Sequence, residues 1–247
     1  MEFFGEVVAW FGDAANWSGS DGVPVRIGEH LVLSMVPLLV AVAVAIPIGA
    51  WIGHTGRAVN LVINIANIGR AIPSLAILAV VTMLLQAWLV DIGLRSVSSE
   101  IATMIAMTAL AIPPILTNTY VGVSEVDRDL VEAGRGMGMR SGQILSRVEL
   151  PVALPVILAG VRTAAVQVVA TATLGAVFAT GGLGRFIIDG IAQRRYDEVF
   201  AGAIIVAALS ILTELAFTLV ERRAVPGRRS PGRVAARPVQ GTVDIAG

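Results

Sequence analysis

Few residues of this chain have the types and spacing that enzymatic or metal chemistry needs. The chain of 247 residues contains no cysteine, which excludes disulfides, thiolate nucleophiles and cysteine-ligated metals. His30 and His54 are isolated, and neither a His-Glu-x-x-His zinc pattern nor a Gly-x4-Gly-Lys phosphate loop occurs. The sequence therefore predicts no catalytic residue, no metal and no cofactor.

Polar residues gather instead in one charged segment, 121–150. Ser124 and Asp127 can cap a first helix over 125–135, and Ser141 can cap a second helix that runs to the end of the segment. Glycines between the two helices allow backbones to approach closely and turn. These glycines are Gly134, Gly136 and Gly138.

Four long runs without a charged residue surround this segment. They are 31–53, 71–90, 101–124 and 163–184. Each can cross a hydrocarbon core, which needs roughly 20 apolar residues as a helix. Together with 55% hydrophobic residues and a mean hydropathy of +0.80, these runs predict an all-α polytopic membrane protein.

We expect five membrane spans, at 31–53, 58–90, 101–120, 152–180 and 199–220. The fourth span, 152–180, begins next to Pro151, and proline is well tolerated at the start of a helix. The second is too long for one straight span, so we interpret it as a single helix kinked at Pro73, between Arg70 and Ser74. Two short helices meeting there, or a sixth span, are the alternatives.

The chain divides into three regions. Residues 1–28 contain a short amphipathic helix and then a loop, and the helix either lies in the membrane interface or packs on a partner subunit. Residues 29–222 form the membrane domain. Residues 223–247 are rich in Pro, Gly and Arg, and we expect a disordered tail.

The arginines predict the orientation, because cytoplasmic loops carry an excess of positive charge. With 121–150 on the inner side and five spans, eleven of the eighteen arginines lie inside and five outside. Arg70 and Arg162 lie within spans. This distribution favours an N-terminus outside and a C-terminus inside, whereas a sixth span would move the N-terminus inside.

A motif in the charged segment resembles the coupling segment of ABC-importer permeases, the EAA loop. It reads Glu132-Ala133-Gly134-x3-Gly138-x9-Val148-x-Leu150-Pro151. Gly134 replaces a commoner alanine of that family, and Val148 replaces a commoner isoleucine. Seven positions at fixed offsets over twenty residues make a chance match improbable.

Five further blocks resemble the permeases of osmoprotectant importers, which carry glycine betaine, choline, carnitine or proline. The blocks are 69–76, 113–120, 154–164, 171–176 and 181–184. Together with the coupling motif, the resemblance covers roughly residues 30–220.

The resemblance implies a type I importer fold in a bacterial cell membrane. Two permease subunits, alike or closely related, would sit side by side, with two ATP-binding subunits on the cytoplasmic side and a separate substrate-binding protein on the other. It implies no nucleic acid and no cofactor. The residues that would couple to the ATPase are Glu132, Ala133, Gly134, Gly138, Met139, Arg140, Leu150 and Pro151.

Polar and kink residues within the spans are candidates for the substrate path. They are Arg70, Pro73, Ser74, Asn118, Thr171 and Thr173. Intramembrane charges are often functional, but Arg70 can equally brace the kink or pair with Glu214, and small polar side chains also hold helices together. Arg162 and Glu214 are expected to be structural anchors. Few aromatic residues fall within the spans, so the aromatic cage that holds a quaternary ammonium group is expected in the binding protein.

Two other readings remain open at this point. The substrate could be another small metabolite, such as an amino acid or a sulfonate. A channel would need a filter ring, and a membrane-embedded enzyme would need convergent His, Asp or Glu within the spans. The sequence indicates neither feature.

Overall fold

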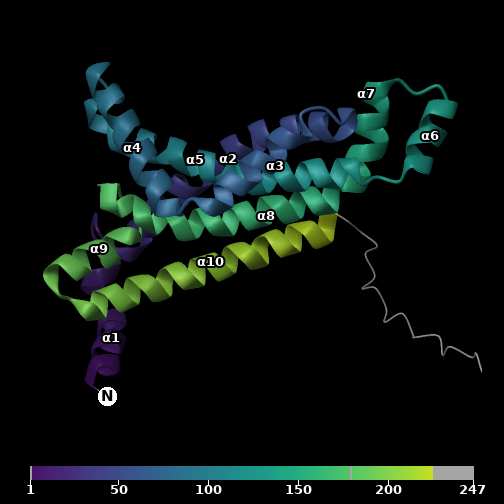
Figure 1. Cartoon of the computed structure of the whole chain (residues 1–247). Coiled ribbons are helices and arrows are strands. Elements are labelled where there is room, and N and C mark those ends of the chain that lie inside the picture. Colours follow the sequence, from purple (N-terminus) through teal and green to yellow (C-terminus); the bar gives the residue numbers. More distant parts are fainter. Residues whose placement is uncertain (1, 179, 225–247) are drawn as a thin grey trace, which may run out of the picture.

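The computed structural model describes residues 2–178 and 180–224, which form an all-helical molecule (Figure 1). The long helices are α2 (Val23–Thr55), α4 (Ser74–Asp91), α5 (Ser98–Ser124), α8 (Leu150–Gly175) and α10 (Tyr196–Ala224). The short helices are α1 (Glu2–Gly12), α3 (Val59–Ala71), α6 (Arg128–Gly136), α7 (Ser141–Ile144) and α9 (Gly184–Gln193). A π-helical turn, Leu145–Glu149, joins α7 to α8.

Within the described residues, five helices are long and apolar enough to cross a membrane, which confirms the expected number. They are α2, α4, α5, α10 and the continuous helix Ser141–Phe178 that contains α8. Helices α6 and α7 lie at one end of this bundle, and α1 and α9 lie at the other (Figure 1). We call these the coupling end and the distal end.

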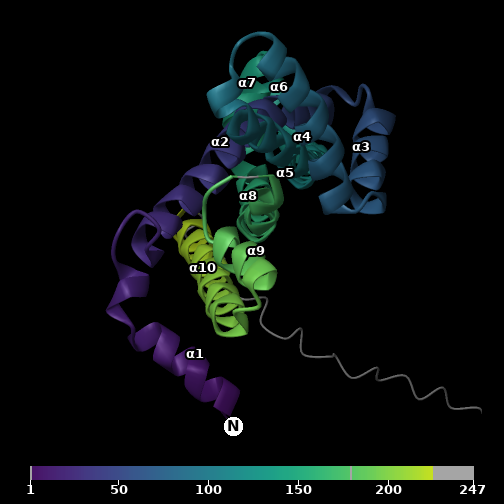
Figure 2. The ribbon, with the colours of Figure 1, turned by 90° about the vertical axis from the view of Figure 1, so that its left-hand side faces the viewer.

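The centre of the bundle is built from α2, α5 and α8, which pack on one another. Fully buried alanines form much of this core, and they include Ala41, Ala45, Ala106, Ala111, Ala164 and Ala165. Small side chains allow membrane helices to approach closely and gain van der Waals contact. Helix α10 packs on α8, and α3 and α4 pack on α5 (Figure 2).

Glycines bring the central helices closest together. A Cβ at Gly49 of α2 would lie 2.9 Å from the carbonyl oxygen of Leu116 in α5. A Cβ at Gly160 of α8 would lie 2.6 Å from the Cβ of Asn118, also in α5. Helix α5 is therefore held between α2 and α8 with little space on either side.

The single kinked helix expected over 58–90 is wrong, and the alternative of two helices is right. Helix α3 ends at Ala71, and α4 begins at Ser74 with Pro73 as its N-cap residue. Proline cannot donate to the preceding turn and disfavours helical backbone in the residue before it. With 13 residues, α3 is too short to span, so this region supplies one span and not two.

Two other expectations need correction. The loop expected up to residue 28 ends earlier, because α2 begins at Val23 with a proline in its first turn. Helix α9 lies between the expected spans 152–180 and 199–220, where the sequence predicted no helix. The tail expected from residue 223 lies almost wholly outside the described residues, and α10 includes its first two residues.

The N-terminal helix α1 packs on α10, where the rings of Phe3 and Phe200 lie 4.8 Å apart. Val7 and Trp10 are buried, whereas Phe4 and Val8 are largely exposed. The helix therefore has one apolar face on its own chain and a second apolar face that this chain leaves uncovered.

Candidate functional site

The coupling end is formed by a helical hairpin, α6 and α7. Asp127 caps α6, since its Oδ1 accepts a hydrogen bond from the Asp129 amide at 3.0 Å. Ser124 does not act as a cap, because it is the last residue of α5 and its hydroxyl donates to the Val121 carbonyl. The cap of α7 is Arg140, whose amide donates to Gln143 Oε1 at 2.8 Å, and Ser141 is the first residue of that helix.

The turn of the hairpin uses two glycines in different ways. Gly138 has a φ of +80°, in the left-handed region that favours glycine. Gly134 is buried in α6, and a Cβ there would lie 3.5 Å from Met139 Sδ and 3.6 Å from Ile144 Cγ1. These are ordinary contacts, so the site has room for the alanine that related loops carry more often.

The predicted coupling residues lie on both sides of this hairpin. Glu132, Ala133, Gly138 and Arg140 are exposed, and Met137 at the turn exposes 76% of its surface. Because an exposed, short and internally capped element is rigid enough to dock on another protein, the geometry suits a contact with a partner.

Leu150 and Pro151 lie where the hairpin joins α8. The sequence predicted separate helices here, but one helix runs without interruption from Ser141 to Phe178. Its turn at Leu145–Glu149 is π-helical, and the Leu150 amide donates to the Leu145 carbonyl. The wider turn accommodates the ring of Pro151, which would otherwise clash with the preceding turn.

His54 connects the end of α2 to this joint, a role that sequence reasoning missed. Its Nδ1 lies 2.5 Å from Oε2 of Glu149, and its Nε2 lies 2.5 Å from Oγ of Ser141. Glu149 is buried, with 6% of its surface exposed. His54 was read as isolated because its partners are 87 and 95 residues away in the sequence.

A groove of about 400 Å³ opens beside this contact, between the ends of α2 and α5 and helix α6. Its charged lining residues are Arg128, Glu132, Arg135 and Glu149. The coupling end therefore presents mixed charge around a hollow next to the exposed hairpin.

A second cavity, of about 240 Å³, lies between α3, α4, α5 and α8 and opens at the surface, where Thr163 is exposed. Its polar side chains are those of Thr117, Asn118, Thr163 and Gln167. Two further lining residues, Ala109 and Leu110, precede Pro113 and Pro114 by four positions, so their carbonyls lose the amide donors that other residues would supply. The described lining is thus neutral and rich in hydrogen-bond acceptors.

Of the predicted path residues, Asn118 is in this cavity, and its amide donates to the Pro114 carbonyl at 2.8 Å. Arg70 follows the lining residue Gly69 in α3, but its side chain lies outside the described part of the structure. The remaining four, Pro73, Ser74, Thr171 and Thr173, do not line the cavity. Sequence reasoning missed Thr117, Thr163 and Gln167, because each is a polar residue within a long and mostly apolar run.

Arg162 of α8 lies against α10. Its guanidinium is 3.5 Å from Glu214 and 3.3 Å from Glu221, and it donates to the Thr218 hydroxyl at 3.3 Å. Glu214, which the sequence offered as a partner for Arg70, thus has Arg162 beside it. These contacts tie two spans together, as expected of an anchor.

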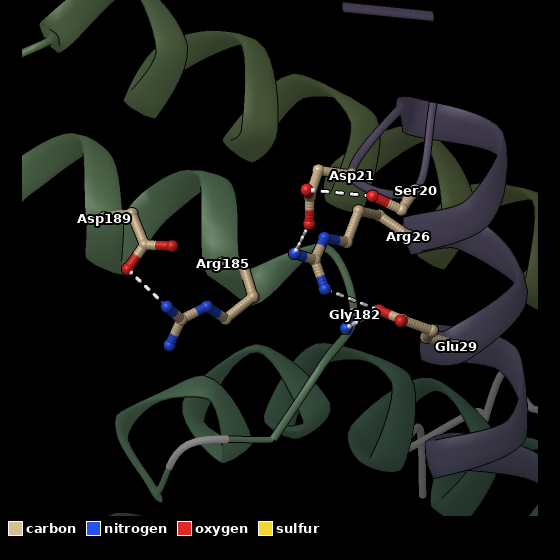
Figure 3. A network of polar contacts seen from close by, with 7 residues as sticks. All are labelled: Ser20, Asp21, Arg26, Glu29, Gly182, Arg185 and Asp189. Atoms are coloured by element: carbon tan, nitrogen blue, oxygen red, sulfur yellow. Dashed lines mark hydrogen bonds and ion pairs between the residues drawn. The ribbon is translucent and has the colours of Figure 1, made fainter. Parts of the chain in front are cut away.

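At the distal end, a polar network fixes the loop before α9 to α2 (Figure 3). Arg26 lies 2.9 Å from Glu29 and 2.5 Å from Asp21. Glu29 accepts a hydrogen bond from the Gly182 amide at 2.7 Å. Gly182 has a φ of +88°, so the loop turns sharply at this contact.

The sequence and fold match known transport proteins. Residues 45–226 match the family described as "Binding-protein-dependent transport system inner membrane component". The carnitine transport permease protein OpuCB of Listeria monocytogenes is 37% identical over 202 residues, which cover 82% of this chain and 88% of that protein. The glycine betaine/carnitine/choline transport system permease protein OpuCB of Bacillus subtilis (strain 168) is 32% identical, over 81% of this chain and 88% of that protein.

The fold is shared with a solved transporter. A chain in an inward facing structure of the MetNI methionine ABC transporter matches with a TM-score of 0.69 at 22% identity, over 82% of this chain and 96% of that chain. This likeness confirms the expected importer fold. The family match includes the hairpin, the joint at Glu149 and the neutral cavity. These features therefore belong to a multi-pass inner membrane subunit without a catalytic role. Such a subunit works with an ATPase and a binding protein. The chain belongs to the family of inner membrane components of binding-protein-dependent transport systems, and it is an ABC-importer permease.

Proposed function

We propose that this permease carries osmoprotectants of the glycine betaine, carnitine and choline type. The observation that carries the proposal is the likeness to permeases named for carnitine, for glycine betaine/carnitine/choline and for choline, at 32–37% identity over at least 80% of this chain.

The cavity between α3, α4, α5 and α8 supports this substrate class. A quaternary ammonium group has no N–H to donate, and it is attracted to the negative end of carbonyl and hydroxyl dipoles. The neutral lining offers such acceptors at Thr117 and at the carbonyls of Ala109 and Leu110, and Gln167 can donate to a carboxylate. The neutral described lining of this cavity also avoids trapping an ion that must leave again.

The proposed assembly contains two permease subunits, two ATP-binding subunits and one separate binding protein. In it, the α6–α7 hairpin docks on an ATPase subunit, through Glu132, Ala133, Gly134, Gly138, Met139 and Arg140, and the joint at Leu150 and Pro151 passes its movement to α8. The coupling end faces the cytoplasm and the N-terminus lies outside, with the C-terminus inside. Arg70, Pro73, Ser74, Asn118, Thr171 and Thr173 remain proposed path residues.

Reconstitution tests the substrate class. The permease, its ATPase and its binding protein are placed in proteoliposomes, and ATP-dependent uptake of labelled glycine betaine, carnitine and choline is compared with that of amino acids and sulfonates. We expect uptake of at least one quaternary ammonium solute, and none without ATP. Uptake confined to an amino acid or a sulfonate would contradict the substrate class and leave the permease role intact.

Deletion of residues 132–138 tests the docking surface. We expect the deletion to abolish co-purification with the ATPase while leaving membrane insertion intact, because it removes the exposed part of the hairpin. Unchanged co-purification would show that the ATPase docks elsewhere.

A further inference from the structure

We propose that His54 is a positioning residue that couples the ATPase-facing hairpin to helix α2 as well as to α8. We call the contact of His54 with Ser141 and Glu149 the His54 clasp. The proposal rests on the docking role of the hairpin given above, and it adds a second route by which movement at the hairpin reaches the substrate path.

The clasp joins three elements at one point. His54 lies in the last turn of α2, Ser141 is the first residue of α7, and Glu149 is the last residue of the π-helical turn. Each ring nitrogen of His54 is used, one for each partner, at 2.5 Å. The imidazole therefore has a fixed orientation between the hairpin and the bundle.

The His54–Glu149 pair of the clasp is also largely withdrawn from solvent, whereas Ser141 is exposed. The side chains of His54 and Glu149 expose 13% and 7% of their surface. A carboxylate this buried is costly unless it is paired and hydrogen-bonded. Because His54 supplies that partner, loss of the imidazole leaves Glu149 without its compensating contact and favours another position for the joint.

The joint that the clasp holds interrupts the regular hydrogen bonding of a long helix. A π-helical turn is rare within an α-helix and is frequently found at a functional site. Pro151 lies two residues after this turn and removes one more backbone donor. Ser141 lies on the hairpin side of this turn and Glu149 at its far end, so the contacts with His54 hold both sides of the turn against the same residue of α2.

Helix α2 can pass the movement on, because His54 directly follows a close contact between α2 and α5 at Gly53. A Cβ at Gly53 would lie 2.9 Å from the Tyr120 carbonyl oxygen and 2.8 Å from the Val123 Cβ. Helix α5 carries Thr117 and Asn118, which line the neutral cavity. The clasp thus links the hairpin to the cavity through α2 and α5, in parallel with the direct route along α8.

The test is the number of ATP molecules hydrolysed per solute transported, measured in proteoliposomes for the wild type, His54→Ala and Thr55→Ala. Thr55 is the matched control, because its exposed hydroxyl bonds only to the backbone at the end of α2, where it donates to the Trp51 carbonyl and accepts from the Arg57 amide. We expect His54→Ala to keep ATPase co-purification and ATP hydrolysis, and to raise ATP used per solute by about tenfold, the scale of one lost charge-assisted hydrogen bond. Thr55→Ala should match the wild type.

An unchanged ratio in His54→Ala, or a parallel loss of hydrolysis and transport, would overturn the clasp as a coupling element. Failure of the proposed function has a different signature, since the wild type itself would then show no ATP-dependent uptake of quaternary ammonium solutes or no docking through the hairpin.

A cross-link provides a second measurement, which remains informative if His54→Ala folds poorly. The chain has no cysteine, so His54→Cys with Ser141→Cys creates the only thiols. We expect this double variant to be uncoupled when reduced, and a short bifunctional thiol reagent that joins the two positions to restore the wild-type ratio. A reduced variant that is fully coupled, or a cross-link that restores nothing, would contradict the proposal.

Discussion

Gly53 of α2 packs directly against Val123 of α5, so that a Cβ at position 53 would lie 2.8 Å from the Val123 Cβ. We expect Gly53→Ala to push the two helices apart and to destabilise the permease by about 1–3 kcal/mol, the usual cost of overpacking. Thermal denaturation of the purified complex in detergent measures this. Gly136→Ala is the control, because a Cβ there meets nothing within 4 Å, and its melting temperature should not fall.

The two glycines of the coupling hairpin should respond differently to alanine. Gly134→Ala fits without a close contact and should retain transport, with a small gain in stability of about 0.5–1 kcal/mol from helix propensity. Gly138→Ala places a Cβ at a φ of +80° and should cost about 1–2 kcal/mol. Melting temperature and ATPase co-purification measure both variants. Equal losses in the two would show that the backbone at 138 differs from the structure.

Replacing Arg162 or Arg70, the two arginines within the spans, by alanine should affect assembly and transport to different degrees. Arg162 contacts Glu214 and Glu221 across two spans, so Arg162→Ala should lower assembly and transport together. Each of these partly exposed pairs contributes at most about 1 kcal/mol. We expect Arg70→Ala, next to the break before Pro73, to lower transport more than assembly. Quantifying membrane-inserted protein beside solute uptake distinguishes the two, and an equal loss of both in Arg70→Ala would assign it a structural role.

The neutral cavity predicts a transport defect without an ATPase-docking defect. Gln167→Leu removes an amide of similar size from the lining and should reduce uptake several-fold, while co-purification with the ATPase stays unchanged. Thr108→Val is the matched comparison, because Thr108 donates to Met104 within α5 and does not line the cavity. If Thr108→Val impairs uptake and Gln167→Leu does not, the path runs outside this cavity.

Hydropathy predicted the five spans and local motifs predicted the hairpin, because each of these features is specified by residues that are close together in the sequence. Long uncharged runs identify spans, and glycines with capping residues identify the hairpin. The break at Pro73 was located correctly but interpreted wrongly. A proline specifies where a helix is disturbed, and packing of α3 against α5 decides whether the two parts remain one helix.

The clasp and the cavity lay beyond sequence reasoning because they depend on contacts between distant residues. His54 meets its partners only once α2 and α8 are packed through α5. Thr117, Thr163 and Gln167 come from two helices whose rotation about their own axes the sequence does not specify. A single polar residue in an apolar run can either line a path or hold two helices together, and its neighbours across the helix interface decide which.

The uninterrupted helix from Ser141 to Phe178 has 38 residues and is therefore about 57 Å long, against about 30 Å for the hydrocarbon core. The helix is thus longer than the bilayer is thick, and it extends from the α6–α7 hairpin nearly to the loop that Glu29 holds at the distal end. Movement of the hairpin that passes the turn at Leu145–Glu149 can therefore reach the distal end along a single helix.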